Sequence, residues 1–144
     1  MPIANYSTSV EALKTVGEIQ GMLVAHGAKS ILMSYGRDGS IESLSFTVET
    51  PYGDMPIKLP VDARAVLKVL EKQQVPPRFA NYPQAVRVAW RIVKDWVRAQ
   101  MAILETEMVK MEQIFLPYMI TKNDRTFYET MVDHQFYLTE GDGK

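Results

Sequence analysis

Glycine is confined to two parts of this chain, and this constrains the fold more than any other sequence feature. Six glycines lie between Gly17 and Gly53, two lie at Gly141 and Gly143, and residues 54–140 contain none. Tight turns often need the positive φ that glycine tolerates. The chain is therefore expected to turn repeatedly in its first third and to be mainly helical afterwards.

An amphipathic helix is predicted over residues 9–26, where apolar residues recur at helical spacing. Thr8 and Glu11 have the spacing of a capping box, in which each side chain bonds to the backbone of the other. Gly27 suits a left-handed C-terminal cap. His26 is expected to act at the same end, as a cation or as a capping side chain.

Three short strands are predicted next, over residues 29–35, 41–49 and 55–59. Turn residues at 36–39 and 51–53 separate them, since Asp-Gly favours positive φ and proline presets the φ of a turn. The middle segment alternates apolar and polar residues, which is typical of a sheet covered on one face. The segments are expected to form an antiparallel meander.

Helices are predicted over the remainder of the chain. A short helix over residues 62–73 has Asp62 as its N-cap. A long helix follows, with Asn81 as a suitable N-cap, and can extend as far as Leu116 before Pro117 stops it. About 33 helical residues would span roughly 50 Å, which exceeds the diameter of a compact domain of this length. This helix is therefore expected either to break or to project toward a partner.

The length of 144 residues is that of one domain. We expect a single α+β domain over 1–144: a helix, a three-stranded antiparallel meander, a helix, a long C-terminal helix, and a short tail helix over 125–134. The αβββα part covers residues 9–73, and the helical extension covers residues 82–138.

The composition disfavours several classes of site. The chain has no cysteine, and its only histidines are His26 and His134, so thiolate and histidine-rich metal sites lack ligands. Glu105, Glu107 and Glu112 have no helical histidine at the spacing of a carboxylate–histidine site. We expect no metal, no cofactor and no catalytic residues.

No membrane partner is predicted. The chain has no run of about 18 uncharged apolar residues, and its N-terminus lacks the basic start and apolar run of a signal peptide. We expect a cytoplasmic protein.

The net charge of −1 conceals a basic middle, because residues 58–98 contain nine basic and three acidic residues. Four of the cations, spaced for one face of the long helix, fall within an arc of about 60°. Three more are four residues apart on the preceding helix. Such rows suit phosphate backbones. The candidate nucleic-acid-binding residues are Arg64, Lys68, Lys72, Arg87, Arg91, Lys94 and Arg98.

Two other interpretations of these cations remain open. They can form a solvated face whose long side chains cover the rim of the core. Alternatively, they can pair with acids elsewhere in the molecule or on a partner. In a second, antiparallel copy these acids would be Glu105 and Glu112, which continue the same arc of the helix.

The long helix is apolar over most of its circumference, which is typical of a deeply buried helix. Two short helices and a small sheet are not expected to cover all of it, so we predict a dimer or higher oligomer. The alternative is a monomer core that covers the helix completely. The candidate interface residues are Trp90, Val97, Met101, Leu104, Met108 and Met111.

Three segments resemble small uncharacterised proteins encoded by bacteria and their phages: Phe46–Gly53, Val88–Trp96 and Phe115–Met119. The resemblance implies a prokaryotic or phage setting and no particular activity. The order of elements over residues 9–73 also resembles that of double-stranded-RNA-binding domains. The basic run that this family carries at the start of its second helix is absent here.

The leading functional prediction is non-catalytic nucleic-acid binding through the basic helix faces. The alternative is a protein-interaction module, such as a phage inhibitor of a host defence protein. A small enzyme or a nucleotide-sequestering protein ranks third. The expected partners are therefore nucleic acid, a host protein, or a second copy of the chain.

Overall fold

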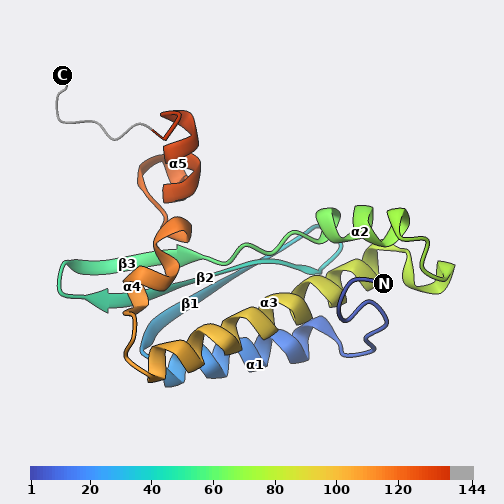
Figure 1. Ribbon diagram of the computed structural model, residues 1–144, viewed down its shortest axis with the longest axis horizontal. Helices are drawn as coiled ribbons and strands as arrows, with labels where there is room; N and C mark the ends of the chain where they lie inside the picture. Colours follow the sequence, from blue (N-terminus) through green and yellow to red (C-terminus); the bar gives the residue numbers. More distant parts are fainter. Residues whose placement is uncertain (137–144) are drawn as a thin grey trace.

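The computed structural model describes residues 1–136 and confirms the α+β class (Figure 1). The elements in chain order are α1 (Ala12–Ala25), β1 (Ala28–Tyr35), β2 (Ile41–Thr50), β3 (Gly53–Lys58), α2 (Ala63–Lys72), α3 (Tyr82–Glu105), α4 (Met111–Phe115) and α5 (Phe127–Asp133). Short 3-10 turns occupy 77–79, 116–118 and 122–124. Residues 137 and 138 of the predicted helical extension lie outside the described residues.

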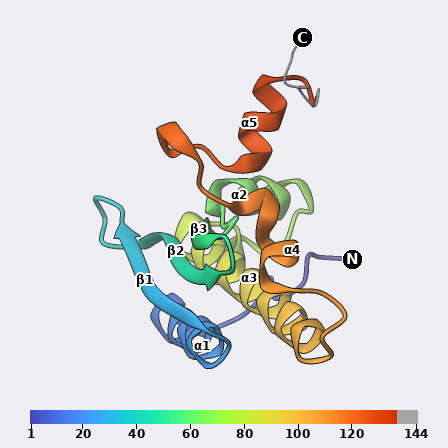
Figure 2. The ribbon, with the colours of Figure 1, turned by 90° about the vertical axis from the view of Figure 1, so that its left-hand side faces the viewer.

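The sheet is the predicted antiparallel meander, with β2 in the middle. A two-residue turn joins β2 to β3, and Gly53 closes it with a φ of 116°, where a side chain would be strained. Leu44, Phe46 and Val48 of β2 are buried, and the intervening residues are more exposed. Helices α1 and α3 cover the apolar face, so the sheet has one covered side as predicted (Figure 2).

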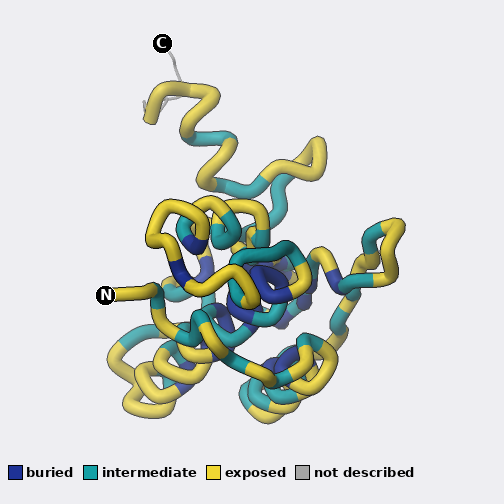
Figure 3. The backbone as a smooth tube through the Cα atoms, turned by 90° about the vertical axis from the view of Figure 1, so that its right-hand side faces the viewer, coloured by how far each residue is buried: buried dark blue, intermediate teal, exposed yellow. Residues whose placement is uncertain are grey.

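The main core lies between the sheet and these two helices, where the buried backbone segments gather in Figure 3. Trp90 is its largest side chain, and its indole N–H donates to the carbonyl of Ile41 at 3.1 Å. Phe115 packs edge-on against Phe46 and Trp96, with ring centroids 5.3 Å and 5.7 Å away. The core thus draws on segments between Ala12 and Met119.

Local sequence signals correctly predicted where most of the expected helices begin. Asp62 caps α2 by accepting from the N–H of Ala65 at 3.1 Å, and Asn81 caps α3 by accepting from the N–H of Gln84 at 2.9 Å. The tail helix α5 lies within the predicted range 125–134.

The predicted capping box at the first helix is wrong. Helix α1 begins at Ala12, and its N-cap Glu11 makes no side-chain capping bond. The Thr8 hydroxyl instead accepts from the N–H of Val10 at 3.1 Å, in a stretch between the turn at residues 4–7 and the start of α1 that is not yet helical.

The predicted long helix breaks after Glu105 and does not continue to Leu116. Glu107 takes a left-handed φ of 62°, and its N–H donates to the carbonyl of Leu104 at 3.0 Å, which ends the helix. The chain turns back, and this return buries Phe115 of α4 in the core.

Beyond α4, the chain runs along the outer edge of β3. The N–H of Ile120 donates to the carbonyl of Pro56 at 2.8 Å, and a bridge pairs Met119 with Ile57. Helix α5 then stands away from the body of the molecule (Figure 1).

Candidate functional site

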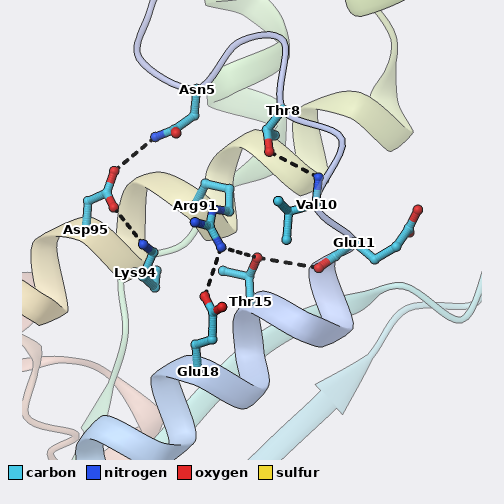
Figure 4. Close-up of polar contacts among 9 residues, drawn as sticks. All are labelled: Asn5, Thr8, Val10, Glu11, Thr15, Glu18, Arg91, Lys94 and Asp95. Atoms are coloured by element: carbon cyan, nitrogen blue, oxygen red, sulfur yellow. Dashed lines mark hydrogen bonds and ion pairs between the residues drawn. The ribbon is translucent and has the colours of Figure 1, made fainter.

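Arg91 is bound inside the fold. Its Nη1 donates to Glu18 Oε1 at 2.9 Å and to the hydroxyl of Thr15 at 3.3 Å, both on α1 (Figure 4). Only 18% of its side chain is exposed. Arg91 therefore joins α3 to α1 and is neutralised by an acid from another element.

Lys94 is also buried within the fold, and only 6% of its side chain is exposed. Its ammonium lies 3.1 Å from one carboxylate oxygen of Asp95, and the other oxygen accepts from the side-chain amide of Asn5 at 3.0 Å (Figure 4). Partial burial raises the pKa of Asp95, but the bonds from Asn5 and Lys94 outweigh it and leave the pKa below its usual value. This group ties the N-terminal segment to α3.

Arg87 and Arg98, the two end positions of the predicted row of cations on α3, differ in their exposure and in their contacts. Arg87 is half-buried, and its Nε donates to Gln84 Oε1 at 2.9 Å. Arg98 is exposed and forms no ion pair or hydrogen bond with the rest of residues 1–136. The prediction that the four α3 cations form one free phosphate-binding face is wrong. The alternative in which these cations pair with acids elsewhere in the molecule holds for Arg91, whose partner is Glu18.

Helix α2 retains its predicted basic row. Arg64, Lys68 and Lys72 are exposed, and none forms an ion pair or hydrogen bond among the described residues. At about 100° per residue they span roughly 80° of the helix surface. Glu71 lies about 20° outside this sector, on the side of Arg64, and lowers the net charge of the surrounding surface by one. We call the three cations the α2 basic face.

Helix α2 is anchored through its opposite side. Leu70 is fully buried and belongs to a second apolar cluster with Val75 and Ala85, the latter on α3. This packing leaves the cations directed to solvent.

A polar hollow of about 430 Å³ adjoins this face. Arg64 and Lys58 of β3 both line it, together with the hydroxyl residues Ser34 and Ser43. Glu42 and Asp62 lie in the same lining, so the hollow holds both signs of charge.

Lys58 was missed as a candidate site residue. The alternation of polar residues in β2 and β3 could have indicated which residues share the outer face, since residues two apart in a strand point to the same side.

The predicted interface on α3 is largely internal. Trp90, Val97 and Met101 are buried within the chain, so the prediction that they meet a partner is wrong. Leu104 and Met111 are half-buried against the same core, and only Met108 is strongly exposed. The sheet, α1, α2 and α4 together cover the apolar surface of α3.

His26 joins the C-terminal ends of α1 and α3. One ring nitrogen lies 2.8 Å from the carbonyl oxygen of Met22, and the other lies 2.9 Å from Glu105 Oε2. Both partners are acceptors, so the doubly protonated ring makes both bonds, and the bond to Met22 and then that to Glu105 raise the pKa of His26. The predicted capping role is confirmed, and Glu105 is engaged within its own chain.

No three His, Cys, Asp or Glu side chains of residues 1–136 lie close enough together to hold a metal ion. In the same part of the chain, no helix combines the length and apolar character needed to cross a membrane.

Comparison of the chain with protein-family models, curated proteins and solved structures finds no match. The resemblances to phage and bacterial proteins and to double-stranded-RNA-binding domains therefore stay predictions.

Proposed function

We propose that this protein is a non-catalytic nucleic-acid-binding protein whose phosphate contacts come from the α2 basic face. The observation that carries the proposal is that Arg64, Lys68 and Lys72 remain exposed and unneutralised within residues 1–136. The α3 cations, in contrast, are mostly engaged inside the fold.

The geometry suits contact with a phosphate backbone. Cations four residues apart on a helix are about 6 Å apart along its axis, which is close to the spacing of successive phosphates on one strand. Lys58 and the serine hydroxyls of the adjoining hollow can donate to phosphate or sugar oxygens. No described element supplies a row of side chains suited to reading bases, so binding is expected to depend little on sequence.

The salt dependence of binding tests this proposal. Three phosphate contacts predict a slope of about −2.7 in log K against log salt for duplex DNA, and about −2.1 for a single strand. Affinity for duplex should then fall about 40-fold between roughly 50 and 200 mM salt. Fluorescence anisotropy with labelled oligonucleotides measures both slopes.

A matched pair of double variants locates the contacts. Lys68→Gln/Lys72→Gln should reduce the duplex slope by about 1.8. The control Arg37→Gln/Lys122→Gln removes the same charge from exposed positions outside α2 and should leave the slope unchanged. Equal effects of both variants would show that net charge, not the α2 basic face, governs binding, and undetectable binding at low salt would refute the proposal outright.

A protein-interaction module is the second candidate, favoured by α5. Tyr128, Val132 and Phe136 are exposed at i, i+4 and i+8 on or beside a helix that stands off the body. Between α5 and the outer face of the sheet lies a hollow of about 640 Å³. A partner recovered with the wild-type chain and lost with Val132→Asp, while the fold is retained, would support this function.

A further inference from the structure

The outer edge of β1 is the starting point for an inference about self-association. β1 pairs with β2 on one side only, whereas the outer edge of β3 is occupied by the segment at Met119 and Ile120. Within residues 1–136, β1 is thus the open edge of the sheet. Figure 2 shows β1 and α1 together on that side, with no other helix or strand beyond them.

The register shows which backbone groups face this edge. The carbonyl of Leu44 accepts from the N–H of Leu59 at 3.0 Å, on the β3 side. Adjacent residues of a strand direct their backbone groups to opposite edges, so Ser45 faces β1, where its partner is Leu32. The residues on either side of Leu32 therefore direct their N–H and C=O groups outward.

Those two residues are Ile31 and Met33, and the arrangement is self-complementary. A two-fold axis at Leu32 sets Ile31 of one copy opposite Met33 of the other as hydrogen-bonded pairs. The two Leu32 side chains then face each other as a non-hydrogen-bonded pair, with Cβ atoms about 5 Å apart. Leu32 is 68% exposed in the single chain and would be covered by its own counterpart.

Helix α1 presents a second exposed surface beside the middle of β1. Gln20 of α1 donates to the sulfur of Met33 at 3.7 Å, which places the middle of α1 beside the middle of β1. The exposed face of α1 carries Leu13 and Val24 near its two ends. A two-fold axis through Leu32 would bring Leu13 of one copy toward Val24 of the other.

Gly17 and Gly21 lie between these two residues on the same exposed face. Outside the adjoining turns of α1, no heavy atom of the described residues lies within 4 Å of where a Cβ would stand at either glycine, so packing against other elements does not require them. Glycine inside a helix lowers its stability. The pair alone would not define a surface, but beside an open strand edge it permits close approach of a second helix.

We propose that β1 and the exposed face of α1 form a two-fold interface with a second copy of this chain, joining two sheets through antiparallel β1 strands. Irregularities in pairing occur at both ends of β1, between Ala28 and Ser30 and between Ser34 and Tyr35, and limit the stretch of regular pairing. Because each copy has one open edge, the assembly closes as a dimer. This inference does not depend on nucleic-acid binding, since the α2 basic face lies on other elements.

Charge substitution at Leu32 tests the two-fold axis. The wild type should show twice the mass of 16.4 kDa in light scattering at about 100 µM. Leu32→Lys and Leu32→Glu should each be monomeric, because like charges then face each other, and their equimolar mixture should recover the double mass through a Lys–Glu pair. Tyr52→Lys, at the exposed turn between β2 and β3 and outside the proposed contact, should remain dimeric.

Several results would overturn the inference: a monomeric wild type at this concentration, a wild-type mass above that of a dimer, a dimer insensitive to both Leu32 variants, or a mixture that stays monomeric.

Cysteine substitution gives a test that does not disturb the charge. The chain has no cysteine, so Leu32→Cys should form an intermolecular disulfide at least about ten times faster than Tyr52→Cys under the same mild oxidation. Equal rates would contradict the interface even if the charged variants failed to fold.

Discussion

The contact between Arg91 and Glu18 gives the sharpest prediction about the basic middle of the chain. If Arg91 belongs to the α1–α3 contact, replacing it should lower stability, whereas a solvated cation should tolerate the change. Arg91→Gln loses a charge-assisted bond to Glu18 at 2.9 Å and a bond to the hydroxyl of Thr15 at 3.3 Å. Together these bonds should be worth about 2 kcal/mol.

A double-mutant cycle isolates the ion pair. Glu18 is 39% exposed, so water screens the interaction, and we expect a coupling of about 1 kcal/mol between Arg91→Gln and Glu18→Gln. Urea unfolding near neutral pH measures all four free energies. The coupling energy should decrease near 1 M salt, because the Debye screening length there is only about 3 Å.

Arg98→Gln is the matched control, since Arg98 lies on the same helix and has no ion pair within residues 1–136. Its effect on the free energy of unfolding should stay within about 0.5 kcal/mol. A coupling below about 0.3 kcal/mol, with Arg91→Gln no more harmful than Arg98→Gln, would refute the reasoning.

Three further predictions concern stability. His26 has a raised pKa, so its contribution should be fully present below the unfolded value of about 6.5 and lost as the pH rises through the folded value; thermal unfolding at about pH 5.5 and 8.5 should show a larger loss for the wild type than for His26→Gln. Trp90→Phe should cost about 2–4 kcal/mol in urea unfolding, because it opens space in the core and leaves a β2 carbonyl without its donor. Asn81→Ala should cost about 1 kcal/mol through the lost helix cap, and an unchanged unfolding midpoint would contradict the assigned cap.

The order of elements could be predicted because it rests on local signals. The caps at Asp62 and Asn81, the alternation in β2 and the turn before Gly53 each act within a few residues. Such features do not depend on where the rest of the chain lies.

The end of α3 could not be predicted in this way. Glu107 adopts a left-handed conformation with no glycine or proline to signal it. What favours the turn is the burial of Phe115 between aromatic rings from β2 and α3. That contact forms only in the folded chain.

The predicted cations fall into an engaged set on α3 and an exposed set on α2 for the same reason, since contacts between distant segments decide which of them are engaged. Arg91 and Glu18 are 73 residues apart in sequence, so helical spacing could show which cations share a face but not which acid lies opposite. The burial of Trp90 and Val97 likewise depends on how fully four neighbouring elements cover α3. The row on α2 stays exposed because no other element of residues 1–136 packs over it, and its part in nucleic-acid binding stays a prediction.

Backbone amide NMR during titration with a duplex oligonucleotide tests the central claim most directly. We predict that chemical-shift changes concentrate in residues 63–72 of α2 and near Lys58, and that they diminish in Lys68→Gln/Lys72→Gln. The seam between α1 and α3 around Arg91 should stay unchanged, since its cations are engaged within the fold. Changes centred on that seam, or none on α2 when binding is saturated, would contradict the account.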